Sequence, residues 1–159
     1  MSGEVPRRSK NEKALAAALR FLAYRPRAEA EIRKRLARAF PAPVVDATLN
    51  RLRTLGHLDD AAFARWWRDQ RDRNKPKGAV AIRRELRRLG VAPGTIEEAL
   101  AGLDEDAAAI AAGERQASKL HDLAQRPFLE RLIPYLRRRG FALSVARRAA
   151  YALWETRAK

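Results

Sequence analysis

The sequence predicts an all-α protein, built as an elongated, curved array of three tandem three-helix repeats. The chain of 159 residues has only eight glycines and eight prolines, and the good helix formers Ala, Leu, Arg and Glu dominate it. Pairs of apolar residues at i and i+4, which share one face of a helix, recur with a spacing of fifty residues. These pairs, which we interpret as the second helix of each repeat, are Ile32 and Leu36, Ile82 and Leu86, and Leu132 and Leu136.

The first helix of each repeat is expected ahead of these pairs and has a more variable apolar face. Asp59 and Asp60, and the carboxylates at 104–106, stand where the second and third of these helices should begin. A carboxylate at that position caps free amides and interacts favourably with the helix dipole. The expected apolar positions are Leu15, Leu19 and Leu22, then Phe63, Trp66 and Trp67, then Ala109, Ile110 and Leu120.

Turn residues mark the passage from the second helix to the third. Gly90 and Gly140 suit a left-handed position just after a helix, whereas the first repeat lacks this glycine and its helix should end before Pro41. A proline suits the first turn of a helix and a serine suits an N-cap, which predicts the starts of the third helices. The residues concerned are Pro43, Pro93 and Ser144, and the apolar positions that follow are Val44, Val45, Leu49 and Leu52, then Ile96, Leu100 and Leu103, then Val145, Ala149 and Leu153.

These elements divide the chain into a disordered basic arm at 1–11 and repeats at 12–56, 57–103 and 104–159. Each repeat is too small to bury a full core alone, so neighbouring repeats are expected to stack and share a hydrophobic seam. The array should therefore expose a long surface.

The net charge of +15, from 34 basic and 19 acidic residues, exceeds what solubility requires and points to a polyanionic partner. Nucleic acid is favoured over an anionic membrane surface, because no amphipathic helix stands apart from the repeats. No apolar run approaches the roughly 18 residues that a membrane span needs, and the N-terminus lacks the apolar segment of a signal peptide. We therefore expect a cytoplasmic protein.

Motifs for catalysis and metal binding are missing from the sequence. The chain has no cysteine, and its two histidines, His57 and His121, lie outside any metal-ligand pattern. The acidic segment from Asp104 departs from a calcium-binding loop at Ala109 and Arg115, where Gly and Glu are needed. We expect no catalytic residue, no metal site and no cofactor.

A cationic stripe is predicted on the second helix of the middle repeat. Arg83, Arg84, Arg87 and Arg88 lie opposite its apolar face and can bind phosphates, with an affinity that falls as counterions are added. The alternative is an ordinary solvated helix face. Recurrence of basic residues in the other repeats favours binding, and these residues are Arg33, Lys34 and Arg38, and Arg137, Arg138 and Arg139.

An aromatic pair opens the second repeat. Trp66 and Trp67, with Arg65, Arg68 and Arg71 nearby, suit a platform on which single-stranded bases stack. Their spacing from Phe63 is also that of a buried helix face, and core packing is the favoured interpretation.

The charge is uneven further along the chain. The linker at 71–78, which contains Arg73, Lys75 and Lys77, is either a phosphate-binding loop or a solvated surface loop. The segment 91–125 instead carries an excess of carboxylates. Such a mixed surface suits a partner made of both protein and nucleic acid.

The segment at the start of the second repeat resembles the RecX family. Gly56-His57-Leu58-Asp59-Asp60-Ala61-Ala62-Phe63-Ala64, followed by Trp66-Trp67-Arg68 and Arg71, is similar to the segment Gly-x-Leu-Asp-Asp-x-x-Phe-Ala of that family. The pair Glu85-Leu86 and the segment 25–32 also resemble it, and the likeness spans roughly residues 14–155. The chain departs from the family at the missing glycine before Phe40, at Pro134 and in its alanine-rich third repeat.

The resemblance implies a regulator that binds RecA, or the RecA filament on single-stranded DNA, and restrains recombinase and ATPase activity in DNA repair, recombination and the SOS response. It implies a monomer whose direct binding to single-stranded or double-stranded DNA is weaker. The alternatives are a stand-alone nucleic-acid-binding helical protein that acts without RecA, and a scaffold for helical protein partners. The residues expected to contact partner or nucleic acid are Arg25, Arg27, Arg33, Lys34, Arg65, Trp67, Arg68, Arg71, Arg73, Lys75, Lys77, Arg83, Arg84, Arg87, Arg88, Arg137 and Arg138.

Overall fold

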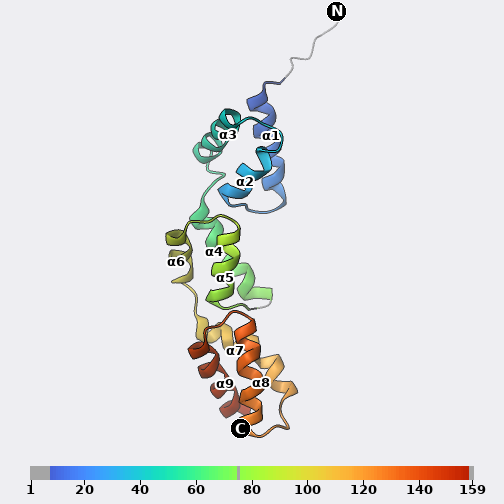
Figure 1. Ribbon diagram of the computed structural model, residues 1–159, viewed down its shortest axis with the longest axis vertical. Coiled ribbons are helices and arrows are strands. Elements are labelled where there is room, and N and C mark those ends of the chain that lie inside the picture. The colour runs from blue at the N-terminus through green and yellow to red at the C-terminus, as the bar shows by residue number, and fades with distance from the viewer. Residues whose placement is uncertain (1–7, 75, 158–159) are drawn as a thin grey trace, which may run out of the picture.

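The computed structural model describes residues 8–74 and 76–157, without the side chains of residues 72–74. Over these ranges the secondary structure is entirely helical, and Figure 1 shows the helices grouped in threes along one long axis. The predicted all-α array of three-helix repeats is therefore confirmed. Within the described ranges, none of the helices is both long and apolar enough to cross a membrane.

The first unit contains α1 (Lys10–Tyr24), α2 (Glu29–Leu36) and α3 (Ala42–Thr54). The second contains α4 (Asp60–Asn74), α5 (Ala79–Arg88) and α6 (Pro93–Leu100), and the third contains α7 (Glu105–Lys119), α8 (Gln125–Arg138) and α9 (Leu143–Arg157). We propose 12–56, 57–103 and 104–159 as the three units. The expected arm at 1–11 falls mainly on residues 1–7, which lie outside the described residues, and α1 already begins at Lys10.

Short-range capping explains where several helices begin. The carboxylate of Asp59 accepts a hydrogen bond from the amide of Ala62 at 3.0 Å, and that of Asp104 accepts one from Ala107 at 3.0 Å. Both predicted caps are confirmed, as are the prolines in the first turns of α3 and α6. The prediction of Ser144 as an N-cap is wrong, because α9 begins one residue earlier, at Leu143.

Glycines end the second helices of the second and third units. Gly90 has a φ of 82° and Gly140 a φ of 90°, the left-handed conformation that L side chains rarely adopt. In the first unit, α2 ends at Leu36 and a turn leads to Pro41, the residue before α3. The predicted difference between the first repeat and the other two is confirmed.

Each unit buries its own apolar cluster, on the helix faces that the periodicity predicts. Ile32 and Leu36 lie in the first cluster, Ile82 and Leu86 in the second, and Leu132 and Leu136 in the third. A continuous seam between units is not observed within the described residues, where the main exception is Ala28, a first-unit residue in the second cluster. The expectation of a shared hydrophobic seam is therefore wrong for most of the interface.

The second and third units meet where the N-terminal end of α5 lies against the C-terminal end of α8. The amide of Gly78 donates to the carbonyl of Arg139 at 2.9 Å, and the amide of Val80 donates to that of Gly140 at 3.1 Å. A carboxylate oxygen of Glu105, on α7, accepts from the amide of Ala79 at 2.9 Å. The free donors of one helix end thus meet the free acceptors of another.

The first and second units meet in an equivalent way. Asp60, in the first turn of α4, accepts a hydrogen bond from the amide of Glu29 at 2.9 Å. Glu29 is the repeat equivalent of Ala79, because the two residues are fifty positions apart. Gly90, at the end of α5, lies so close to the Cβ of Ala30 that a side chain at this glycine would overlap it. Burial raises the pKa of Asp60, and the neighbouring carboxylate of Glu29 adds to this rise, while the hydrogen bond from the Glu29 amide opposes it.

Glu85 ties α4 and the linker to α5. It accepts hydrogen bonds from the indole of Trp67 at 2.7 Å, from Arg71 at 3.0 Å and from the Lys77 ammonium. Burial alone would raise the pKa of Glu85, but these donors outweigh it together and hold the pKa below its ordinary value. The charged carboxylate therefore stabilises the second unit.

A substitution at Gly140 tests the close approach between units. We expect Gly140→Ala to lower the free energy of unfolding by about 2–4 kcal/mol, because the new Cβ would overlap Ala81 in addition to adopting an unfavourable φ. The matched control is Gly56→Ala, which has a φ of 77° and nothing within 4 Å of the added Cβ, and should cost about 1 kcal/mol. Urea denaturation measures both, and equal losses would contradict the close approach.

Acidification tests the role of Glu85. Because the folded state lowers the pKa of Glu85, its contribution is complete above the ordinary value of 4.5 and is lost as the pH falls through the folded pKa. We expect Glu85→Gln to destabilise the protein by about 1–2 kcal/mol at neutral pH, and this difference to shrink below the ordinary pKa. Thermal unfolding at several pH values measures it, with the exposed Glu98→Gln as a control that should stay near wild type.

Candidate nucleic-acid and partner interface

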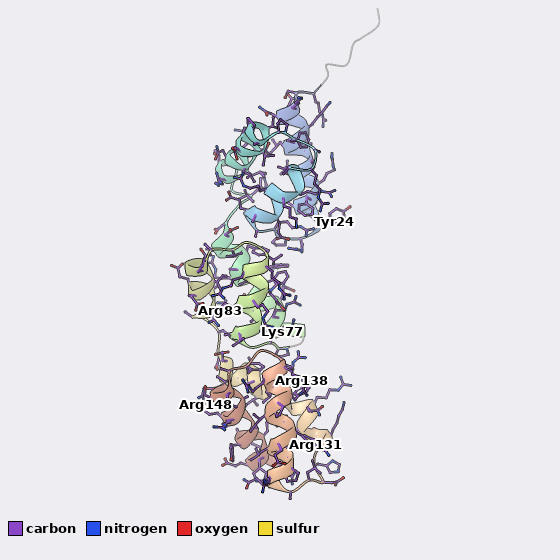
Figure 2. The ribbon with its side chains drawn as sticks, viewed as in Figure 1. Tyr24, Lys77, Arg83, Arg131, Arg138 and Arg148 are labelled. Carbon is purple, nitrogen blue, oxygen red and sulfur yellow. The ribbon has the colours of Figure 1, made fainter. Side chains whose placement is uncertain are left out.

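The second helices α8, α5 and α2 follow one another end to end, and we call this arrangement the column (Figure 1). Figure 2 places Lys77 and Arg138 on either side of the lower junction. Exposed basic side chains lie at repeat-equivalent positions along the column, and none pairs with a carboxylate that the structure describes. These column cations are Lys34 and Arg38, then Arg84, Arg87 and Arg88, then Arg137 and Arg138.

Arg33 and Arg83 belong to the same helices but are already neutralised. Arg33 pairs with Asp46 of α3 at 2.7 Å, and Arg83 pairs with Glu97 of α6 at 2.6 Å. The hydrogen bond between Arg83 and Glu97 raises the pKa of Arg83 and lowers that of Glu97. These two predicted site residues therefore join the second helix to the third within one unit, rather than extending the row of free cations.

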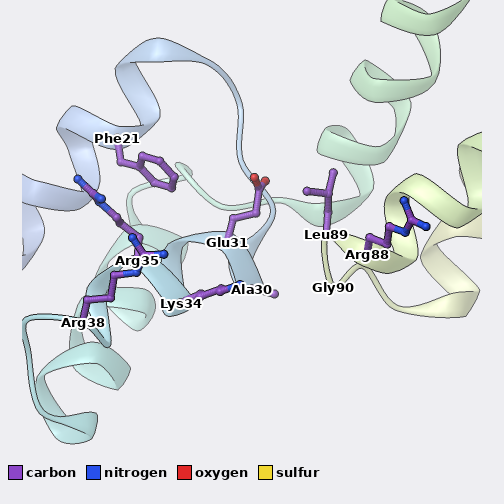
Figure 3. A pocket seen from close by; sticks show the side chains of 9 residues that line it. All are labelled: Phe21, Ala30, Glu31, Lys34, Arg35, Arg38, Arg88, Leu89 and Gly90. Atoms are coloured by element: carbon purple, nitrogen blue, oxygen red, sulfur yellow. The ribbon is translucent and has the colours of Figure 1, made fainter.

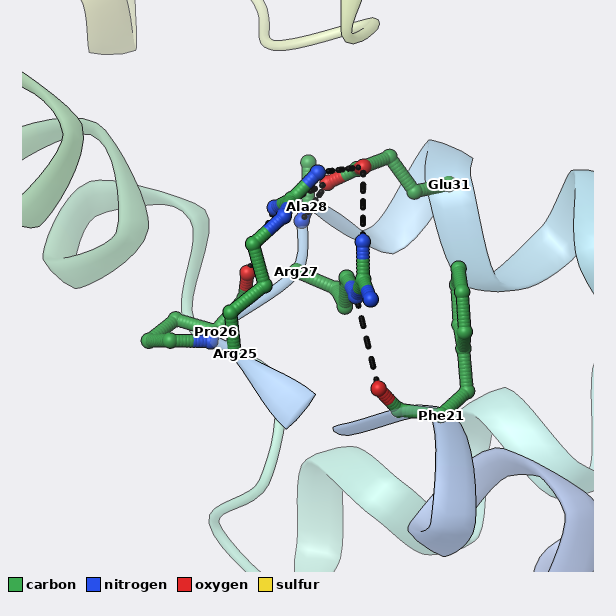
Figure 4. Close-up of polar contacts among 6 residues, drawn as sticks. All are labelled: Phe21, Arg25, Pro26, Arg27, Ala28 and Glu31. Atoms are coloured by element: carbon green, nitrogen blue, oxygen red, sulfur yellow. Dashed lines mark hydrogen bonds and ion pairs between the residues drawn. The ribbon is translucent and has the colours of Figure 1, made fainter. Parts of the chain in front are cut away.

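Arg25 and Arg27 surround a carboxylate of their own unit (Figure 4). Glu31 accepts from Arg25 at 2.6 Å and from the amide of Ala28 at 2.8 Å, and lies 3.9 Å from Arg27. Burial and the charge of Arg25 lower the pKa of Arg27, whose guanidinium also lies 3.9 Å from the ring centre of Phe21. Both arginines hold the loop between α1 and α2 in place.

The aromatic and basic residues of α4 are also largely occupied. Trp67 is half-buried against the second core, its indole donates to Glu85, and the guanidinium groups of Arg25 and Arg71 lie 5.6 Å and 4.7 Å from its ring. Arg68 donates to the carbonyl of Ala99 at 2.6 Å. These contacts favour core packing over a stacking platform for bases.

The remaining predicted residues of this region separate into three groups. Arg65 is exposed on α4 and forms no ion pair with a described carboxylate, but it does not belong to the column. Lys77 is held by Glu85. Lys75 and the side chain of Arg73 lie outside the described residues, so the predicted role of the linker stays a prediction.

A basic pocket lies at the junction of the first two units (Figure 3). It has a volume of about 410 Å³, and Lys34 and Arg35 of α2, with Arg38 of the following turn, face it together with Arg88 of α5. Its carboxylate, Glu31, is engaged by the two arginines of its own loop. Arg35 was not among the predicted site residues, because helical spacing alone did not show that the end of α5 lies beside it.

The acidic segment at 91–125 serves mostly within the fold. Asp104 caps α7, Glu105 caps α5, Asp106 pairs with Arg148 at 2.9 Å, and Glu97 pairs with Arg83. These contacts give four of its carboxylates a role within the fold, and the use of the segment as a surface for a mixed partner stays a prediction. Over the described residues, no cluster of His, Cys, Asp and Glu is suited to hold a metal ion.

Family models match the first two units. The model described as the first three-helix domain of RecX matches residues 14–52, and the model of the second three-helix domain matches residues 59–100. Among solved structures, RecX from Lactobacillus salivarius superimposes with a TM-score of 0.82 at 20% identity, covering 91% of this chain and 96% of that one. A second RecX regulatory protein has a TM-score of 0.71 at 28% identity, covering 86% of this chain and 69% of that one.

Curated relatives carry the name regulatory protein RecX. The relative from Mycobacterium avium is 38% identical over 143 residues, covering 87% of this chain and 83% of the relative. The relative from Geobacillus kaustophilus is 39% identical over 134 residues, covering 82% of this chain, which spans about 50% of that longer protein. The two domain matches, this identity across most of a relative's length, and the shared helical array show that the chain belongs to the RecX family of regulatory proteins.

Proposed function

We propose that the chain is a regulator of RecA that binds the RecA filament on single-stranded DNA and restrains its recombinase and ATPase activity. The observation that carries the proposal is the column, along which exposed cations of three units have no carboxylate partner among the described residues. Membership of the RecX family supports the regulatory role. The chain acts as a monomer in the cytoplasm, where its DNA partner lies, and contributes binding rather than chemistry.

A repeating row of cations suits a repeating polymer. Lys34 and Arg84 are fifty residues apart in sequence, as are Arg38, Arg88 and Arg138 in turn, so each unit offers a similar contact. Weak contacts on one frame reinforce one another, because the first contact raises the effective concentration of the next. A chain that bridges neighbouring subunits in this way opposes the growth or turnover of the filament.

The column cations also suit direct contact with phosphates. An arginine without an intramolecular carboxylate keeps its donors free for a phosphate and releases counterions when it binds. This feature by itself favours the second candidate function, a nucleic-acid-binding protein that acts without RecA. The two functions differ in whether RecA is needed for tight binding.

Inhibition of RecA-driven ATP hydrolysis on single-stranded DNA tests the proposed function. We expect Arg88→Glu with Arg138→Glu to raise the concentration needed for half-inhibition by about tenfold or more, because rigidly placed charges are reversed. The matched control is Arg20→Glu with Arg51→Glu, which changes exposed cations on α1 and α3 by the same charge and should shift inhibition less than about twofold. Unchanged hydrolysis at saturating wild-type protein, with DNA binding intact, would favour the stand-alone function.

The salt dependence of binding to single-stranded DNA separates free cations from neutralised ones. We expect Arg84→Gln and Arg88→Gln each to reduce the slope of log K against log salt by about 0.7, since each removes one phosphate contact. Arg83→Gln should leave the slope nearly unchanged, because Glu97 already neutralises that arginine. Fluorescence titration at several salt concentrations measures the slopes. An equal reduction in all three variants would contradict the distinction between free and neutralised arginines.

A further inference from the structure

The third unit departs from the other two at one repeated contact between the second and third helices. In the first unit this contact is the pair Arg33 and Asp46, and in the second it is the pair Arg83 and Glu97. Ile133 lies fifty residues after Arg83 and stands in its place. In the other two units, the carboxylate of this pair comes from the third helix.

Buried residues show which positions of the third helices α3, α6 and α9 are equivalent. Val45, Ile96 and Ala146 are each buried on the core side of their helix, and the acidic partners Asp46 and Glu97 directly follow the first two. The residue that follows Ala146 is Arg147. The third unit thus has an isoleucine where the others have arginine, and an arginine where the others have a carboxylate.

An open groove lies at this place between α8 and α9. One hollow of about 730 Å³ and an adjoining one of about 420 Å³ share Ile133, Pro134 and Leu143 in their lining. Leu143 is 38% exposed, and Tyr151, at the far side of the larger hollow, is 48% exposed. Apolar side chains of this size normally gain free energy when they are covered.

Basic side chains border the groove. Arg137 and Arg138 line the smaller hollow and Arg147 lines the larger one, all three are exposed, and none pairs with a carboxylate that the structure describes. The carboxylate in the lining, Glu130, pairs with Arg126 at 2.9 Å. The charge that remains around the apolar floor is therefore positive.

Pro134 adds a feature that suits a peptide. It lies inside α8 and has no amide hydrogen, so the carbonyl of Glu130 receives no helical hydrogen bond from that position. A carbonyl that lacks this helical donor can accept a hydrogen bond from an incoming segment. A basic nucleic-acid site would gain little from the apolar floor, whereas a protein segment can use the floor, the cations and the acceptor together.

We propose that the groove between α8 and α9 is a docking site for an acidic protein segment that carries aliphatic or aromatic side chains beside its carboxylates. Its apolar side chains lie on Ile133, Pro134 and Leu143. A carboxylate of the segment meets Arg147, as Asp46 and Glu97 meet their arginines inside the other units. The groove shares Arg137 and Arg138 with the end of the column. Its apolar floor and Arg147 are separate from the phosphate contacts proposed for α2 and α5.

A defined peptide serves as the probe. It is a fluorescein-labelled helical peptide in which Leu recurs at every third or fourth position and Glu occupies the flanking positions, so that carboxylates border an apolar stripe. One control peptide has Lys in place of Glu, and another has Ser in place of Leu. We expect fluorescence anisotropy to show saturable binding of the Leu and Glu peptide to the full chain, and at least about tenfold weaker binding of either control.

The decisive variant restores the arrangement of the other units. Ile133→Arg with Arg147→Glu copies the ion pairs Arg33–Asp46 and Arg83–Glu97, so we expect it to keep the helical circular dichroism of the wild type while weakening peptide binding at least about tenfold. It lowers the formal charge by one, and Arg20→Gln, which does the same on α1, should leave binding within about twofold. Leu143→Ser, at an exposed position, gives a second test that does not alter charge.

Two results would overturn the proposal. One is a failure of the Leu and Glu peptide to bind better than its Lys and Ser controls. The other is unchanged peptide binding in both groove variants, including the case in which these variants weaken binding of a single-stranded oligonucleotide instead. Neither result bears on the ATPase and salt measurements, because the groove variants leave Arg84, Arg88 and Arg138 intact.

Discussion

The meeting of helix ends is the constraint on which the rest of this structure depends. A helix leaves amide donors free at its start and carbonyl acceptors free at its end, and burying either without a partner is costly. At the lower junction, Gly78 and Val80 of the second unit donate to Arg139 and Gly140 of the third. At both junctions, a carboxylate from the following unit caps the second helix, Asp60 on α2 and Glu105 on α5. Opposite ends of the helix dipoles also meet, which adds to the attraction.

This end-to-end contact joins three separate clusters of basic residues along the column, which we propose as one interface. Each unit buries its own core, so apolar packing alone would leave the orientation of neighbouring units weakly specified. The close approach of Gly90 to Ala30 and of Gly140 to Ala81 sets the second helices in line. Within each of the first two units, one arginine of the second helix pairs with a carboxylate of the third helix: Arg33 with Asp46, and Arg83 with Glu97. The remaining column cations have no carboxylate partner among the described residues, and we propose that they bind the partner.

The third unit shows how a repeat gains a separate property by losing one internal contact. Ile133 and Arg147 replace an arginine and a carboxylate, and the position that carries Lys34 and Arg84 in the other units holds Pro134. The hydrogen-bonded pair is absent at that place, so an apolar floor and an unpaired cation are exposed together. A surface with both features favours protein over a bare phosphate backbone, because phosphates cannot cover apolar side chains.

Sequence alone determined the helices, their grouping, the caps at Asp59 and Asp104 and the glycines that end α5 and α8, because periodicity and capping act over a few residues. It failed at Ser144, since Leu143 already begins α9. It also identified the basic helices, but not which of their cations are free. Arg83 and Arg84 are adjacent and chemically identical, yet Glu97 neutralises the first and no described carboxylate pairs with the second. Only the tertiary structure decided this, because the charge left on a side chain depends on partners that the fold brings from remote segments.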